Sequence, residues 1–271
     1  MSTYEITAYP LAELPVPGWE CFFGQNDPDF HRLIFYTWVI KGNGKTILVD
    51  AGPPPDEADF IKLRKGCQRV DIRSELKWLT SLDAAFQKAN ITPGEIDLLL
   101  ITQPITYHSG GLLQQYFPKA SVYLPKAGML EFLFESPGHP PRDLYFTEAT
   151  WSFLWQLLVQ NRLLMVDDLV EVLPGLFFET TGGHHPGSAA VTVNTAGGRV
   201  SILETAFLKK NIDDEIPIGV AEDTSVCRKA IKRYKTQSDL VLAIHDNTIL
   251  DRFPGGLIEI GPHLVRGDST R

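Results

Sequence analysis

The fold of this chain is decided by the stretch Ile96-Asp97-Leu98-Leu99-Leu100-Ile101-Thr102-Gln103-Pro104-Ile105-Thr106-Tyr107-His108-Ser109-Gly110-Gly111. An apolar run of strand length breaks at Gln103-Pro104 into a polar loop, and the Gly pair then leads into residues 112–116, which can start a helix. Loops at the carboxyl ends of strands in layered α/β proteins often bind ligands, because the rigid sheet aims side chains there. We therefore expect a strand-loop-helix junction at the functional site.

This stretch resembles the signature of the metallo-β-lactamase superfamily, in which a similar strand runs into Thr-His-x-His-x-Asp-His-x-Gly-Gly. On that pattern, the first two His positions hold Gln103 and Ile105. The Asp position holds Tyr107, and only the last His is present, as His108. The resemblance therefore keeps the frame of the motif but loses most of its metal ligands.

Two later stretches resemble family motifs that supply histidine ligands. Residues 181–188 resemble Thr-Pro-Gly-His-Thr-Pro-Gly-His, which makes His184 the counterpart of the third His of the first metal. Residues 244–246 resemble the Gly-His-Asp element, which makes His245 the counterpart of the last His of the second metal. The order of the motifs along the chain is that of the family.

Carboxylate positions of the family are changed or moved into supporting roles. The strand end Glu204-Thr205-Ala206 resembles the one whose Asp bridges the two metals, but here that position is Thr205, with Glu204 in place of Gly. In the resemblance, Asp50 matches an Asp that supports the active-site loop. The sequence alone is equally consistent with an Asp that caps the turn before Pro53. The resemblance makes Asp50 and Asp246 supporting residues that do not bind metal.

The resemblance covers nearly the whole chain and is closest to the N-acyl-homoserine lactonase-like branch of the superfamily. It implies an α/β fold, a four-layer αββα sandwich, formed by residues 1–271 as a single domain. Hydrolysis is the reaction that the family resemblance implies. The implied substrate is a small organic molecule with an ester, a lactone or an activated carbonyl.

The chemistry depends on how many metal ligands remain. A catalytic zinc normally has three protein ligands and an open position. Tyr107 and Thr205 replace carboxylates by neutral hydroxyls, which bind metal poorly unless they lose a proton of high pKa. We therefore predict that the dizinc site is absent and that no metal cofactor is bound. An alternative is one Zn, Fe or Mn ion held by His108, His184 and His245.

Three functions follow from this site. In the first, a metal-free cleft uses residual His, Tyr and Glu side chains as acid-base groups on the substrate, either in hydrolysis or, as a metal-independent lyase or isomerase, in elimination or isomerisation. In the second, the three histidines hold one ion in a lactonase or esterase. In the third, the protein binds a small molecule without catalysis. The candidate catalytic residues are His108, His184, His245, Tyr107 and Glu204, and the candidate substrate-binding residues are Gln103, Ile105, Thr205, Trp151 and Trp155.

Residues 126–170 form an aromatic-rich insert. A helix is expected from about residue 148 to 164, and Trp151, Phe153 and Trp155 on it cannot all face one side. Helices that are apolar on more than one face need a second partner. We expect this insert to form a wall of the substrate pocket, a homodimer contact, or both.

The remaining element predictions come from periodicity and turn residues. An edge strand at residues 4–9 is followed by an irregular, proline-rich segment, and residues 74–89 have the spacing of an amphipathic helix. Two hairpins turn at residues 41–44 and 196–199. The other predictions are strands at 120–125, 170–178, 189–195, 200–206 and 240–246 and a helix at 227–234.

Composition limits the partners. The chain has 271 residues, a formal net charge of -8 and a hydrophobic content of 44%. The charge argues against nucleic acid, and no apolar run reaches the roughly 18 residues of a membrane span. We expect a cytoplasmic protein with a small-molecule substrate and no membrane partner. Three widely spaced cysteines, Cys21, Cys67 and Cys227, indicate reduced thiols in packed regions.

Other polar residues near the motifs are weaker candidates. His185 and Ser188 lie in the second motif, and Ser109 is read as a loop-capping residue because no Gly-x-Ser-x-Gly elbow surrounds it. The remaining histidines are expected at the surface or in structural roles: His31, His139 and His263.

Overall fold

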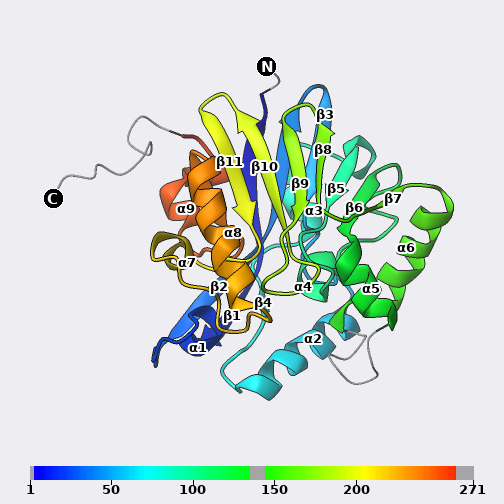
Figure 1. Ribbon diagram of the computed structural model, residues 1–271. Helices are drawn as coiled ribbons and strands as arrows, with labels where there is room; N and C mark the ends of the chain where they lie inside the picture. The colour runs from blue at the N-terminus through cyan, green and yellow to red at the C-terminus, as the bar shows by residue number, and fades with distance from the viewer. Residues whose placement is uncertain (1–2, 135–143, 261–271) are drawn as a thin grey trace.

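The computed structural model describes residues 3–134 and 144–260, and within them the strands form two mixed sheets that face each other (Figure 1). The first sheet has seven strands in the order β4-β1-β2-β3-β5-β6-β7, and the second has five in the order β12-β11-β10-β9-β8. The first contains β1 (Glu5–Pro17), β2 (Phe30–Gly42), β3 (Lys45–Val49), β4 (Lys77–Trp78), β5 (Leu98–Leu100), β6 (Ser121–Pro125) and β7 (Leu163–Val166). The second contains β8 (Leu169–Leu173), β9 (Leu176–Thr180), β10 (Ala189–Thr195), β11 (Gly198–Leu203) and β12 (Leu240–Ala243).

Helices lie on the outer faces of both sheets. The longer ones are α2 (Glu57–Val70), α3 (Leu82–Lys88), α5 (Lys126–Phe134), α6 (Glu148–Val159) and α8 (Thr224–Gln237). The short ones are α1 (Gly18–Cys21), α4 (Thr106–Ser109), α7 (Lys209–Asp213), α9 (Ile249–Arg252), η1 (Pro93–Glu95) and η3 (Pro254–Gly256). No helix of the described residues is long and apolar enough to cross a membrane.

The buried side chains define the layers. One apolar cluster joins both sheets, with Trp38 of β2 and Val191 of β10 among its members, and it includes Ile231 of α8. A second cluster lies between the first sheet and the helices, where Phe86 of α3 and Leu154 of α6 are buried. The expected four-layer αββα sandwich is confirmed.

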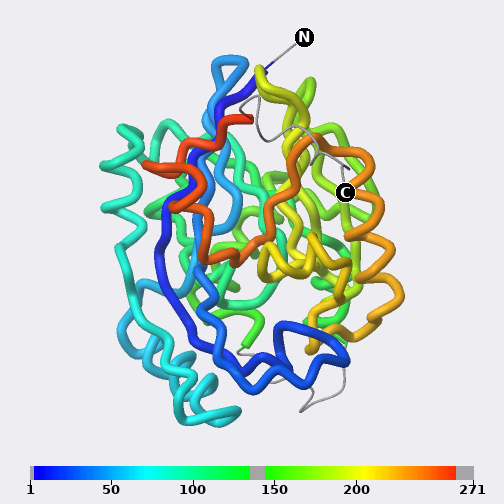
Figure 2. Tube along the Cα trace, turned by 90° about the vertical axis from the view of Figure 1, so that its left-hand side faces the viewer, coloured from blue at the N-terminus to red at the C-terminus, as the bar shows by residue number. Residues whose placement is uncertain are grey.

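Figure 2 shows the red segment before residue 260 beside β1, where the Ile258 amide donates to the Ile6 carbonyl.

The hairpins and the buried strands of the motifs form as predicted, but the helix expected at residues 74–89 does not. The amides of Leu79 and Thr80 donate to the Leu11 carbonyl instead of to a helical partner, and Lys77–Trp78 pairs with β1. The helix α3 begins only after Ser81, whose hydroxyl accepts the Ala84 amide at 3.1 Å. Tertiary pairing with β1 outweighs the apolar spacing of this segment.

Four further predictions differ from the structure. The helix expected from about residue 148 to 164 ends at Val159, because Leu163–Val166 pairs with β6 as strand β7. β1 continues to Pro17 with a register shift between Pro10 and Ala12 in its pairing with β2. Because β4 pairs only with Ala12 and Glu13, the prolines of β1 are not required to donate to that strand. The run at 170–178 is a hairpin of two strands, β8 and β9. Sequence reasoning also missed α2. The helix after the Gly pair is misplaced: α4 ends before it, and a Cβ on Gly111 would lie 2.3 Å from the Ala51 carbonyl oxygen, so that glycine permits close backbone packing.

Candidate functional site

The site is assembled where several strands end at one edge of the sandwich. β3 and β5 pair in parallel, as do β11 and β12, so their carboxyl ends lie at the same edges of the two sheets. The loop after β5 carries His108 and the loop after β9 carries His184. Glu204 follows β11 and His245 follows β12. The fold therefore gathers residues that are far apart in the sequence.

Asp50 holds His108 in a fixed orientation. The carboxylate of Asp50 lies 2.8 Å from His108 Nδ1 and accepts the amide and the hydroxyl of Thr102 at 2.8 and 2.7 Å. Both partners are almost fully buried. Burial alone would lower the pKa of His108, but the charge and hydrogen bond of Asp50 outweigh it and raise the pKa. His108 is therefore biased toward the imidazolium form.

A second histidine-carboxylate pair is formed by His184 and Glu204. His184 Nδ1 forms a short hydrogen bond with Glu204 Oε1, and the Gln103 amide nitrogen lies 3.3 Å from the same ring nitrogen. Glu204 is fully buried, which raises its pKa, but the charge and hydrogen bond of His184 lower it overall. The Glu204 carboxyl is thus kept ionised by its histidine partner.

His245 lies beside His108 in an apolar setting. Its Nδ1 is 3.2 Å from the Ile34 carbonyl oxygen, to which it donates, so the lone pair remains on Nε2. The ring centroids of His245 and His108 are 5.1 Å apart. Burial and the charge of His108 place the pKa of His245 well below its usual range. The neutral His245, which can accept a proton, therefore lies next to His108, whose raised pKa favours its protonated form.

Two phenylalanine rings pack against these histidines. The Phe35 centroid is 4.5 Å from that of His245 and 5.0 Å from that of Tyr107. The Phe207 centroid is 5.0 Å from that of His184 and 5.3 Å from that of His245. These rings leave His108 and His245 only 3% exposed. Sequence reasoning missed both phenylalanines, since neither lies in a position that the family motifs mark.

Two polar atoms next to the histidines have no hydrogen-bond partner among the described residues. They are Glu204 Oε2 and Thr205 Oγ1, and both residues are fully buried. A buried polar atom without a partner is costly and calls for an explanation. In this place, where the family resemblance puts the carboxylate that bridges two metals, it indicates that the site receives a polar atom from a ligand or from water.

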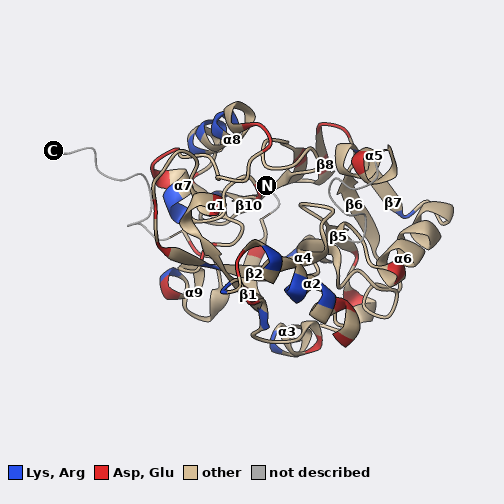
Figure 3. Ribbon diagram, turned by 90° about the horizontal axis from the view of Figure 1, so that it is seen from below, with Lys and Arg blue, Asp and Glu red and all other residues tan. Residues whose placement is uncertain are grey.

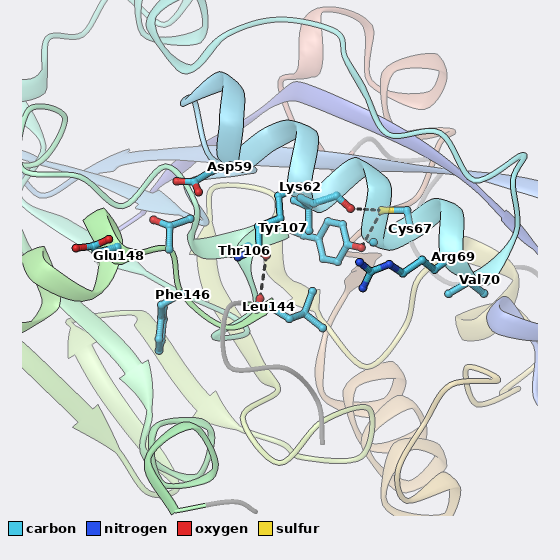
Figure 4. Close-up of a pocket in the computed structure, with 13 residues that line it drawn as sticks. Asp59, Lys62, Cys67, Arg69, Val70, Thr106, Tyr107, Leu144, Phe146 and Glu148 are labelled. Carbon is cyan, nitrogen blue, oxygen red and sulfur yellow. Dashed lines mark hydrogen bonds between the residues drawn. The ribbon is translucent and has the colours of Figure 1, made fainter. Parts of the chain in front are cut away.

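Tyr107 points away from the histidines and toward α2. Its hydroxyl lies 3.0 Å from Cys67 Sγ, as the dashed line in Figure 4 shows, and burial raises its pKa well above the usual value. The ring of Tyr107 lines a cavity of about 580 Å³ between α2 and residues 144–148. Apolar side chains of this cavity include Leu63 and Phe146. Cavities of this size suit small organic molecules.

The other predicted site residues have different surroundings. Trp151 packs against Phe132 with centroids 5.0 Å apart, and Trp155 is 59% exposed on α6, so neither is seen to contact the histidines. Ile105 precedes α4, and its carbonyl accepts the amide of His108. The Asp246 carboxylate binds Arg252 and the Thr248 hydroxyl, which fixes the turn after β12.

The remaining polar candidates have structural contacts. The Ser109 hydroxyl donates to the carbonyls of Ile105 and Tyr145, and Ser188 accepts the amide of His185. His31 pairs with Asp27. The cysteines Cys21, Cys67 and Cys227 are buried free thiols, as expected. His139 and His263 lie outside the described residues.

The residues present do not fit a catalytic zinc site of the kind that the fold family implies. Hydrogen bonds to the Nδ1 atoms of His108 and His245 resemble those that orient metal-bound histidines. Within residues 3–134 and 144–260, however, His108, His184, His245 and Glu204 do not bring three ligand atoms within 4.8 Å of one another. The supporting hydrogen bonds have remained, but the set of direct ligands is not assembled.

One group of three ligand side chains does occur in this part of the chain, at Glu131, His185 and Glu222. His185 Nε2 lies 2.9 Å from the Glu131 carboxylate, and the Gly187 amide donates to His185 Nδ1 at 3.0 Å. A neutral ring that accepts at Nδ1 carries its proton on Nε2, the atom that faces Glu131. A cation there would have to displace that proton, so we do not assign a metal to this group.

His185 also gives a testable pH dependence. Burial and the charge of His184 lower the pKa of His185 to about 4, against the smaller opposing effect of Glu204. The unfolded chain binds that proton below its usual pKa near 6.5, so stability is lost as the pH falls from about 6.5 to 4. In urea unfolding, His185→Gln should lose about 3 kcal/mol less than the wild type over this range. Equal losses in the two proteins would contradict this.

Solved structures share this fold over nearly the whole chain. An N-acyl homoserine lactone hydrolase with N-hexanoyl-L-homoserine at its catalytic metal centre matches 95% of this chain and 100% of its own, with a TM-score of 0.74 and 17% identity. A probable metal-dependent hydrolase from Staphylococcus aureus covers 89% of both chains at a TM-score of 0.69 and 17% identity.

AidC, a dizinc quorum-quenching lactonase, matches 94% of this chain and 89% of its own at a TM-score of 0.65 and 16% identity. No protein-family model matches the sequence, and no curated protein matches it either. The chain therefore has the metallo-β-lactamase fold that lactonases and other hydrolases use. Identities this low establish the fold alone, and the function has to be argued from the site.

Proposed function

We propose that this protein is a small-molecule enzyme, of the hydrolase type, that works without a bound metal ion. Its acid-base groups are buried histidines paired with carboxylates, and its substrate carries an ester, a lactone or an activated carbonyl. The proposal combines the fold that this chain shares with lactonases and the arrangement of its own side chains. The proposed mechanism does not need a set of three metal ligands, which His108, His184, His245 and Glu204 do not form.

The observation that carries the proposal is the contact between His108 and His245. Their ring centroids are 5.1 Å apart, and each Nδ1 has a fixed partner that leaves Nε2 for chemistry. Their pKa values are shifted in opposite directions. Neighbouring groups whose environments separate their pKa values are the usual arrangement of a catalytic acid and base.

The roles of these residues follow from their protonation. In hydrolysis, the neutral His245 accepts a proton at Nε2 from the attacking water, and the protonated His108 donates one to the departing oxygen. Asp50 stabilises the imidazolium of His108. Glu204 Oε2, which has no partner of its own, accepts a hydrogen bond from a hydroxyl of the substrate, and the Thr205 hydroxyl donates one to its carbonyl.

Access to the histidines depends on aromatic side chains. Tyr107 lines the cavity of about 580 Å³, and Phe35 stacks between Tyr107 and His245. In this proposal the substrate occupies the cavity and reaches the histidines when the Phe35 ring turns aside. Catalytic geometry that tightens only in the substrate complex is common in enzymes.

A screen of lactones and esters with chelator-treated protein tests this function. We expect His108→Ala and His245→Ala each to lower turnover by about 100-fold or more, because each removes one of two proton-transfer groups. The control is His31→Ala, which removes a histidine outside the candidate site that pairs with Asp27 and packs against Phe22, and it should retain full turnover. Unchanged turnover in both site variants would reject the assignment, and activity that returns only with one equivalent of zinc would replace it by the mononuclear metal site.

A second candidate is a non-catalytic binding protein, and the packing of Phe35 and Phe207 favours it. Phe35 lies between His245 and Tyr107, which lines the cavity, and Phe207 packs against His184 and His245, so the histidines are buried. In that case a ligand would bind beside Tyr107 and Leu63 without being converted. Calorimetric binding that is weakened by Leu63→Trp and unaffected by His245→Ala, with no turnover of any ligand, would establish this function instead.

A further inference from the structure

An exposed apolar surface covers the outer side of α5, α6 and the edge strand β7. Seven large apolar side chains form this surface, which we call the α5-α6 patch: Leu130 44%, Leu133 41%, Phe134 77%, Trp155 59%, Leu158 41%, Val159 65% and Met165 42% exposed. Four of them, Leu133, Trp155, Leu158 and Met165, line one small apolar hollow, so α5, α6 and β7 present a common face. In Figure 1 these elements lie together at the right-hand side.

The size of the patch decides what it is for. With about 200 Å² for a large side chain, the exposed fractions amount to roughly 700 Å² of apolar surface. The largest apolar patch of a typical monomer is about 300–600 Å², whereas each partner of a stable complex buries about 800 Å². The patch is therefore larger than a monomer needs and close to what one side of a stable dimer provides.

Charge indicates a second copy of this chain as the partner. The chain carries a net charge of -8, so two copies repel each other through most faces. The patch side chains are uncharged, and Figure 3 shows α6 and β7 mostly in tan. The acidic residue of this part of α5, Glu131, turns inward to His185. Like-with-like contact through this patch avoids charge repulsion.

We propose that the protein is a homodimer in solution, with the α5-α6 patch of one protomer packed on the same patch of its partner. A two-fold axis lets one patch meet itself, as most soluble homodimers do. The Trp155 ring of each protomer packs at the hollow that Leu133, Leu158 and Met165 form on the other protomer. Exposed aromatics next to an apolar hollow are typical of the centre of an interface.

Sedimentation equilibrium of the full-length protein tests the proposal. We expect the wild type to have twice the monomer mass at micromolar concentration. Val159→Glu places a like charge within the patch of each protomer and should convert the protein to monomers, with a rise in the dissociation constant of at least 100-fold. Because Val159 is largely exposed, this variant should stay folded, with the circular dichroism spectrum of the wild type and a cooperative melting transition.

Ile72→Glu is the matched control, since Ile72 is 75% exposed but lies outside the patch, and it should remain dimeric. Trp155→Glu is a second patch variant that should behave as Val159→Glu does. A wild type that stays monomeric up to 100 micromolar, including one that binds lipid vesicles as a monomer, would overturn the proposal. So would a dimer that both patch variants leave intact, because the interface would then lie elsewhere.

Discussion

Replacing Asp50 by alanine is expected to lower the free energy of unfolding by about 3–5 kcal/mol, because it leaves a buried histidine without its charged partner. The same change removes the acceptor of the Thr102 amide and hydroxyl. Asp50 also has a φ of 58°, in the left-handed region that Asp tolerates better than alanine does. The measurement is urea unfolding of the wild type and Asp50→Ala at pH 7.

Two controls separate this effect from the loss of any carboxylate. Asp50→Asn keeps an acceptor and tolerates the same backbone conformation, so it should lose clearly less stability than Asp50→Ala. Asp71→Ala removes an aspartate that pairs with Arg73 at the surface, and we expect no resolvable change. If Asp50→Ala unfolds at the same urea concentration as the wild type, Asp50 does not organise the site.

Rebuilding the family's ligand set should create a zinc site. The four substitutions Gln103→His, Ile105→His, Tyr107→Asp and Thr205→Asp supply the residues that the resemblance assigns to the two metals, and Tyr107→Asp also removes the ring stacked on Phe35. We expect the zinc content to rise from background to about two ions per chain, as in dizinc hydrolases. Zinc at 100 times its dissociation constant should then stabilise the fold by about 2.7 kcal/mol for each site that it fills.

The matched control adds His184→Ala to the same four substitutions. Because His184 is the only remaining first-metal histidine in the resemblance, the five-substitution variant should bind markedly less zinc. Zinc-dependent melting curves of both variants and of the wild type make the comparison. If the variant with the four substitutions folds and binds no zinc, the correspondence between the motifs of this chain and those of the family is wrong.

The motifs predicted the fold because they combine local pattern with order along the chain. The apolar strand before Thr102 and the Gly pair after Ser109 place the site loop, and the later motifs bring His184 and His245 to the same edge. Periodicity failed where tertiary pairing competes with it. In the segment before Ser81, hydrogen bonds to Leu11 replace the helix that the apolar spacing predicts.

The packing of the site was beyond sequence reasoning. Phe35 and Phe207 carry no mark in the sequence that distinguishes them from ordinary core residues, yet they cover the histidines. The motif places Tyr107 among the ligands, but only the structure shows its hydroxyl turned to Cys67 on α2. The direction of a side chain in a loop depends on its neighbours in space, which motif spacing does not contain.

The central claim is that the histidine-carboxylate pairs work without a metal ion, and metal content tests it most directly. The protein is purified without added metal and without a histidine-rich tag, and zinc, iron and manganese are measured by plasma mass spectrometry, with the variant that carries the four substitutions as the positive control. We expect less than about 0.1 ion per chain, because His108, His184, His245 and Glu204 do not bring three ligand atoms together. In the separate group of Glu131, His185 and Glu222, the His185 ring carries its proton on the nitrogen that faces Glu131. Close to one ion per chain in the wild type would contradict the claim and identify a mononuclear metal site.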